Sequence, residues 1–399
     1  MKDLFEQDEF FSEEEILDPS NKESFEDLSI QLEDLQQAVT WGTDWTCETI
    51  VNQIKKGSID LNPKFQRREA WSDKRKSIFI ESIIAGLPIP QIILAEKKEK
   101  KGSYIVIDGK QRLISLRRFF SKDKDKDFKS LKLTGMSLVP FFEGLTFEDI
   151  TNNKSFSELI PQMENQPVRT VIIKNWTNEE FLYSVFLRLN TGSVPLSTQE
   201  LRQALHPGEF IDFADDFSTQ SSEIKRILNI KNPDYRMRDV ELVVRYFSFK
   251  YYAPTYHGNL KVFFDNSVKD LNCSWQRNFN KIKNDAQELD NAIKFAHEVF
   301  GNDSFKKWKN EAFDKRINRA IYDIMVYYFS NCELRKALEG KQTDIVHRFK
   351  NLCETDNLFL ASFESSTKNL EPTKTRFITW GKALQEICNI EVDIPLFEK

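Results

Sequence analysis

The sequence lacks the short motifs that identify several large enzyme classes. It contains no Gly-x-x-x-x-Gly-Lys phosphate loop and no Gly-x-Gly-x-x-Gly fingerprint, and glycine is sparse, with 13 in 399 residues. A conventional P-loop NTPase or dinucleotide enzyme is therefore not expected. The five cysteines are scattered and never form a Cys-x-x-Cys pair, which argues against a zinc site and favours reduced core thiols.

Long apolar runs are also missing. No run approaches the roughly 18 residues that a membrane span requires, and the first residues, Met-Lys-Asp-Leu-Phe-Glu, lack the apolar centre of a signal peptide. These absences predict a cytoplasmic protein without a membrane partner.

Aromatic residues, by contrast, are abundant. There are 33 phenylalanines, which favours a packed globular structure, and the length suggests two domains or one domain with large additions. Charge is unevenly distributed, because residues 1–35 carry 13 Asp or Glu and two Lys, whereas the whole chain has a net charge of −5. Such an acidic head is usually a solvated tail; alternatively, it covers a basic groove until a polyanion displaces it.

Periodicity and turn residues predict three regions. We expect an acidic, flexible segment over residues 1–40, a mixed α/β domain over 41–205 and an all-α domain over 206–399, which is an α+β fold class. The expected helices are Thr46–Lys56, one capped by Ser72, Glu179–Leu189, one capped by Ser197 with Glu200, Val240–Tyr252, Gln287–Phe300, Asp314–Phe329 and Thr375–Ile390. The expected strands are Pro90–Glu96 and Ser103–Ile107, paired as a hairpin, and Val168–Lys174.

One strand-to-helix turn concentrates polar groups. An apolar run ends at Asp108-Gly109, and helical periodicity follows it. The pattern predicts Asp108 as the helix N-cap and Gln111 as its capping-box partner. Free N–H groups at this helix start, together with Arg112, suit a phosphate or another anion, although a capped turn of this kind is common in α/β proteins.

Three segments carry a resemblance to a known family. They are Phe-Gln-Arg-x-x-x-Trp, Ile-Asp-Gly-Lys-Gln-Arg-Leu and Phe-Leu-Arg-Leu-Asn-Thr-Gly-Ser-Val-Pro-Leu-Ser, in that order between about residues 45 and 205. The chain here resembles the N-terminal domain of GmrSD-type modification-dependent restriction enzymes, in the ParB and sulfiredoxin-like superfamily. The stretch Pro-Asp-Tyr-Arg-Met-Arg-Asp, with Arg238-Asp239 as a further candidate pair, is similar to stand-alone relatives with a helical second half.

The resemblance implies a site that binds and hydrolyses a nucleoside triphosphate with Mg²⁺, in defence against foreign DNA. Asp108 would orient a metal or water, Gln111 and Arg112 would hold phosphate oxygens, and Gly109 would admit close approach. The remaining expected nucleotide-binding residues are Gln66, Arg67, Lys110, Arg188, Asn190 and Gly192. Many relatives have Gln in place of Lys110. A lysine at this position can also donate hydrogen bonds to phosphate. Alternatively, Arg67 and Arg188 form ion pairs with nearby carboxylates and do not bind the nucleotide.

Two other function classes remain open. A metal-dependent nuclease would need a catalytic histidine, and His206, His257, His297 and His347 lie without a matching Asn or His pair; Asp108-x-Lys110 only weakly resembles another nuclease motif. A non-catalytic nucleotide- or DNA-sensing module is the third class. It would signal to a partner such as a separately encoded nuclease, and a homo-oligomer is compatible with the aromatic helices.

Overall fold

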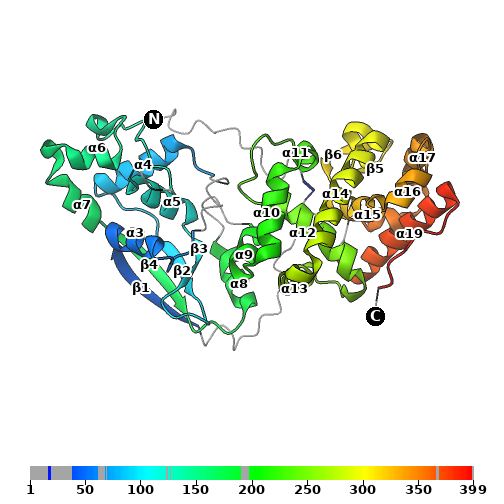
Figure 1. Cartoon of the computed structure of the whole chain (residues 1–399), viewed down its shortest axis with the longest axis horizontal. Coiled ribbons are helices and arrows are strands. Elements are labelled where there is room, and N and C mark those ends of the chain that lie inside the picture. The colour runs from blue at the N-terminus through cyan, green and yellow to red at the C-terminus, as the bar shows by residue number, and fades with distance from the viewer. Residues whose placement is uncertain are drawn as a thin grey trace. The chain divides into compact units, whose positions relative to one another are not determined.

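The computed structural model describes residues 17–18, 38–61, 68, 70–122, 125, 127–189, 197–364 and 368–397. Its contacts divide the chain into two compact units, coloured blue to green and green to red in Figure 1. The first, here called the sheet unit, comprises residues 28–205 and 234–237. The second, the helical unit, comprises residues 1–27, 206–233 and 238–399. The expected segment 1–40 lies outside the described residues except for Leu17, Asp18 and residues 38–40.

The sheet unit is built on four strands in the order β1-β4-β2-β3 (Figure 1). Strands β2 and β3 form an antiparallel hairpin, β1 and β4 are also antiparallel, and β2 and β4 are parallel. The bounds in this unit are β1 Val39–Thr46, α3 Cys47–Lys55, α4 Asp73–Ile84, β2 Ile92–Glu96, β3 Tyr104–Asp108, α5 Lys110–Phe119, η4 Pro140–Phe142, α6 Phe147–Asn152, η5 Lys154–Phe156, α7 Leu159–Asn165, β4 Pro167–Lys174, α8 Glu179–Leu189 and α9 Thr198–Leu205.

Both faces of the β2–β3 hairpin are buried, because alternate strand residues pack against different helices. On one face Leu94, Val106 and Ile172 pack with residues of α3, α4 and α5. On the other, Ile105 and Ile107 pack with residues of α8 and α9. The hairpin strands are therefore apolar up to their last residues, Glu96 and Asp108, and the carboxyl end of β3 opens between two helical layers. This arrangement positions the Asp108 turn.

The helical unit contains most of the remaining helices (Figure 1). Its elements are α10 Glu209–Gln220, α11 Ser222–Leu228, α12 Arg238–Tyr252, η6 Ala253–Thr255, α13 Leu260–Cys273, α14 Trp275–Phe300, η7 Gly301–Asp303, β5 Lys306–Lys309, β6 Ala312–Ile317, α15 Arg319–Phe329, α16 Cys332–Ala337, α17 Gln342–Thr355, α18 Asn357–Ala361 and α19 Leu370–Cys388. No described helix is both long and apolar enough to cross a bilayer.

The predicted fold class is confirmed: a mixed α/β region precedes a mainly helical one. Two details differ. The helix expected from Asp314 begins only at Arg319, because residues 314–317 pair with β5 and Asn318 caps α15, accepting hydrogen bonds from Ala320 N–H and Ile321 N–H. Strand β1 was not predicted, since its sequence Val-Thr-Trp-Gly-Thr-Asp-Trp-Thr is mostly exposed and lacks a clear apolar alternation.

Helices α4 and α5 are linked by an ion pair with a pH-dependent consequence. Arg118 binds Asp73 at 2.8 Å, and Lys76 lies 3.2 Å from the same carboxylate. Burial raises the pKa of Asp73, but the hydrogen bonds and charges of Arg118 and Lys76 lower it by more than this. The net pKa of Asp73 therefore lies below its usual value. The folded state thus favours the carboxylate, so this stabilisation is present above the unfolded pKa and is lost as the pH falls through the folded value.

We expect Asp73→Asn to remove part of the acid sensitivity of unfolding below about pH 4. Urea unfolding of wild type and variant, followed at several pH values, measures this effect. The control is Asp44→Asn, because the pair between Asp44 and Arg169 is more than half exposed on both sides. Equal pH dependence of wild type and Asp73→Asn would contradict the assignment.

Candidate functional site

The turn after β3 has a backbone conformation that requires glycine. Gly109 has φ 98° and is itself the N-cap of α5, with no side-chain cap. The predicted capping box of Asp108 and Gln111 is therefore wrong. The left-handed residue separates Asp108 from the helix by one position, and both predicted capping side chains make other contacts.

Asp108 pairs with Arg112 across this turn. Arg112 NH2 donates to Asp108 Oδ2 at 2.7 Å, and the Asp108 side chain is 23 % exposed whereas that of Arg112 is 6 % exposed. Arg112 Nε is buried without a hydrogen-bond partner. Buried donors without a hydrogen-bond partner are uncommon in native proteins. The site thus presents a fixed cation with one donor unused.

The first turn of α5 adds backbone donors. The first intrahelical hydrogen bond is donated by Leu113 N–H to Gly109 O at 2.9 Å, so Gln111 N–H and Arg112 N–H precede the helical ladder. Together with the positive end of the helix dipole they favour an anion. The buried Arg112 guanidinium is an independent indication of the same ligand charge.

Lys110 has a different environment from the one expected. Its ammonium lies 2.6 Å from Glu200 Oε1, and both side chains are buried. Glu200 also accepts from Ser197 N–H, while Ser197 Oγ accepts from Glu200 N–H, which is the predicted capping box of α9. Lys110 therefore ties α5 to α9, and its role as a phosphate donor stays a prediction.

The Phe-Gln-Arg-x-x-x-Trp segment reaches the turn through its last residue. Trp71 N–H donates to Gln111 Oε1 at 3.3 Å, and Trp71 Nε1 is buried without a partner. Arg68 is buried, and its NH1 donates to Asp234 O at 2.6 Å. The Pro-Asp-Tyr-Arg segment thus contributes Asp234 to the sheet unit. The family resemblance of this segment had predicted no particular contact for it.

Helix α9 contributes two residues that the sequence did not single out. Gln199 and Gln203 are buried one turn apart on a helix that contacts β3 and is bound to Lys110 through Glu200. Gln199 Nε2 and both amide atoms of Gln203 lack partners. Two buried glutamines at i and i+4 would have been the sequence signal, since burying an unpaired amide is costly.

The other predicted residues are only partly placed. Gln66, Arg67, Asn190 and Gly192 lie outside the described residues, and Arg188 is exposed near the end of α8. In the helical unit, Asp239 is buried and accepts from Ser218 Oγ and Val240 N–H, at 3.3 and 3.0 Å. These contacts give Asp239 a structural role at the start of α12.

The donor set at the turn is compatible with Mg²⁺. This ion prefers oxygen ligands and is commonly held by one or two carboxylates, waters and substrate phosphates. Asp108 offers a partly exposed carboxylate whose Oδ2 is engaged by Arg112, leaving Oδ1 available for a metal or its water. A single carboxylate is enough only if phosphate oxygens complete the coordination.

Gly109→Ala is expected to destabilise the sheet unit by about 1–2 kcal/mol, the usual cost of a left-handed L-residue. A Cβ here would also lie 3.2 Å from Arg112 Nε and from Ile92 Cγ1. Urea unfolding measures the loss. The matched control is Gly86→Ala, which has φ 67° but no atom within 4 Å of the added carbon. If Gly109→Ala lowers the unfolding free energy by no more than Gly86→Ala does, the inferred close approach of Arg112 to the turn is contradicted.

Comparison with known families places this site in a defined domain. Residues 47–207 match the family model described as GmrSD restriction endonuclease, N-terminal domain. No curated protein and no solved structure gave a match. The matched range includes Asp108, Arg112, Trp71 and α9, and the contacts of the turn given above lie within it.

Proposed function

Since residues 47–207 form an N-terminal domain of the GmrSD restriction endonuclease type, we propose that the chain acts in defence against foreign DNA by binding and hydrolysing a nucleoside triphosphate at the Asp108 turn. The observation that carries the proposal is the buried Arg112 guanidinium, paired with Asp108 and left with an unused Nε at the start of α5.

The chemistry of phosphoryl transfer suits these groups. Charge that develops on the transferred phosphoryl group is stabilised by fixed donors and a metal ion more than by covalent chemistry. Arg112 and the N–H groups of Gln111 and Arg112 would supply the donors, and Asp108 would hold Mg²⁺ or its water. Mg²⁺, when bound, would neutralise phosphate charge and orient the nucleotide.

Neighbouring residues would contact the rest of the nucleotide. Trp71, Gln199 and Gln203 have buried polar atoms without partners, and a base or ribose offers donors and acceptors to satisfy them. Gln66, Arg67, Arg188, Asn190 and Gly192 remain proposed contacts from the family resemblance. DNA and a separately encoded nuclease are the proposed partners.

The test is phosphate release from the four ribonucleoside triphosphates with Mg²⁺, with and without DNA. Wild type is expected to release phosphate from at least one of them, and Asp108→Asn is expected to lose most of this activity because the metal ligand and the Arg112 partner are both weakened. Nucleotide binding without release from any of the four would replace hydrolysis with a sensing role. Neither binding nor release would refute the proposal.

A further inference from the structure

The helical unit contains a pocket that the proposed function does not use. Its cavity volume is about 760 Å³. None of the described residues that line it is acidic, and five of them are basic or histidine. The lining residues are Arg226, Ile227, Asn229, Ile293, His297, Gly301, Asn302, Ser304, Phe305, Lys306, Lys315, Arg316 and Ile317.

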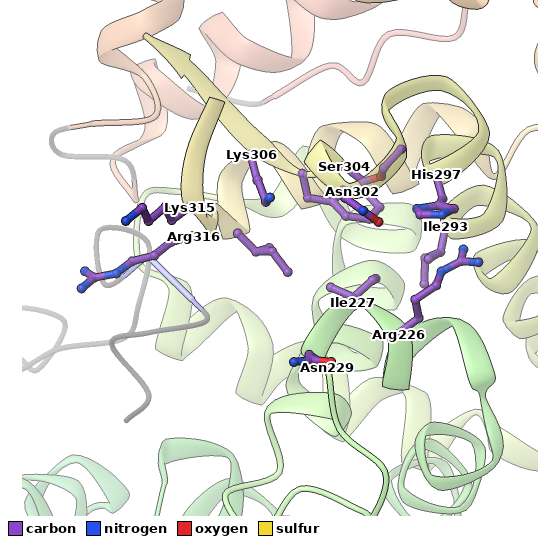
Figure 2. A pocket seen from close by; sticks show the side chains of 13 residues that line it. Arg226, Ile227, Asn229, Ile293, His297, Asn302, Ser304, Lys306, Lys315 and Arg316 are labelled. Carbon is purple, nitrogen blue, oxygen red and sulfur yellow. The ribbon is translucent and has the colours of Figure 1, made fainter. Parts of the chain in front are cut away.

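The basic side chains come from separate elements and spread along the pocket. Figure 2 shows Arg226 and His297 together at one end, from α11 and α14. Lys315 and Arg316 of β6 lie at the opposite end with their side chains directed outward, and Lys306 of β5 lies between the two groups. A single phosphate would meet only one of these groups. An elongated ligand with several phosphates would meet both.

The cations at the two ends differ in their present partners. Arg226 forms an ion pair with Glu223 and Lys306 with Asp303, the latter at 3.1 Å. Lys315 and Arg316 are exposed, and within the described part of the chain neither takes part in an ion pair or hydrogen bond through its side chain. These two residues can therefore bind a phosphate without first giving up a carboxylate.

The floor of the pocket is built from ordered, buried residues. Ile293, Phe305 and Ile317 are each less than a tenth exposed. Asn318 N–H donates to Phe305 O at 2.8 Å, and Ser304 Oγ donates to Gly301 O at 2.6 Å. An apolar floor beneath a row of cations suits a ligand that has both charged groups and flat apolar ones, as nucleotides in a strand do.

We propose that this pocket binds a single strand of nucleic acid through its phosphates. Counterion release from a strand rewards a spaced row of cations, whereas a lone phosphate or mononucleotide gains from only part of the row. The inference goes beyond the nucleotide site at Asp108 and uses none of its residues.

Acidic residues that are close in the sequence to one wall of the pocket offer a second way to change the charge near it by mutation. Leu17 is buried and bridges in parallel to Ile317, and Asp18 N–H donates to Ile317 O at 2.8 Å. In the sequence, the run Glu13-Glu14-Glu15 ends two residues before Leu17. Its charges would lower the affinity of a phosphate ligand.

The experiment is fluorescence anisotropy of a labelled oligothymidylate of about 12 nucleotides, titrated with the full chain over a range of salt concentrations. Wild type is expected to bind, and Lys315→Glu/Arg316→Glu is expected to weaken binding at least about tenfold and to reduce the salt slope by about 1.4, for two lost phosphate contacts at roughly 0.7 each. The milder Lys315→Gln/Arg316→Gln variant, expected to give a smaller loss in the same direction, guards against misfolding.

The matched control is Arg277→Glu/Lys283→Glu, which makes the same change in net charge at exposed positions of α14 outside the pocket. It should bind nearly as wild type does. Glu13→Gln/Glu14→Gln/Glu15→Gln should bind the strand more tightly, and Asp108→Asn should leave strand binding unchanged, which separates this proposal from the nucleotide site.

Three results would overturn the proposal. The first is no strand binding by wild type, and the second is equal weakening by the pocket variant and the α14 control, which would assign the effect to net charge. The third is displacement of the strand by a mononucleotide at equal concentration, which would make the pocket a mononucleotide site.

Discussion

Replacing Arg112 with glutamine is expected to lower the rate of phosphate release about a hundredfold or more, the usual cost of removing one preorganised charged donor from a phosphoryl or acyl transfer site. The side chain is almost fully buried, is held by Asp108 at 2.7 Å and has its Nε unused. It is thus oriented before a ligand arrives. Glutamine keeps polarity and much of the volume but removes the charge and the planar fork of donors.

Two further variants sharpen this measurement. Arg112→Lys keeps the charge without the fork and should retain an intermediate rate. Arg169→Gln removes an exposed arginine of the same unit, which forms an ion pair with exposed Asp44, and should behave as wild type. Steady-state kinetics should show the Arg112→Gln loss in kcat as well as in kcat/KM, because a donor to developing charge acts in the transition state. If Arg112→Gln releases phosphate as fast as Arg169→Gln does, the proposed role of Arg112 is contradicted.

The largest stability effect is expected at Asp323 in the helical unit. Asp323 Oδ1 and Oδ2 accept from Arg245 Nε and NH2 at 2.9 and 2.6 Å, with both side chains fully buried. Burial lowers the pKa of the Arg376 guanidinium to about 10, and the Asp323 charge opposes this effect. Asp323→Asn would therefore remove the carboxylate charge that both buried guanidinium groups share, with Arg245 keeping Glu241 at 3.6 Å, and should cost about 3–5 kcal/mol of unfolding free energy.

Urea unfolding again measures the change, with two comparisons. Glu386→Gln breaks an exposed pair with Arg348 and should change stability by less than about 1 kcal/mol. Arg245→Met/Asp323→Leu removes both charges and should recover part of the loss, since apolar replacement avoids an uncompensated buried ion. If Asp323→Asn lowers the unfolding free energy as little as Glu386→Gln does, then Asp323 does not neutralise the buried arginines of this core.

The local pattern predicted the turn but not its contacts. An apolar strand, Asp-Gly and a helix are visible in consecutive residues, and the strand and helix form where expected. The N-cap was wrong by one residue because the left-handed conformation of Gly109 is a property of the backbone that the side-chain pattern does not specify. The partners Glu200 and Trp71 are 90 and 40 residues from the residues they contact, and local periodicity carries no information on such pairs.

The pocket of the helical unit was less predictable. Its cations come from α11, α14, β5 and β6, which are spread over about 90 residues from Arg226 to Arg316. The acidic head of residues 1–35, with a charge of −11, implies a remainder of about +6 in a chain of net charge −5, but a helix was expected where β6 forms. Lys315 and Arg316 on a helix starting at 314 would point in different directions from those they take on a strand.

The most direct measurement is a crystal structure of the full chain with Mg²⁺ and a non-hydrolysable nucleoside triphosphate analogue. The account predicts phosphate oxygens within hydrogen-bond distance of Arg112 and of the N–H groups of Gln111 and Arg112, with Mg²⁺ bound by Asp108. A nucleotide bound elsewhere, with the Asp108–Arg112 pair unchanged and Arg112 Nε still unpartnered, would contradict it.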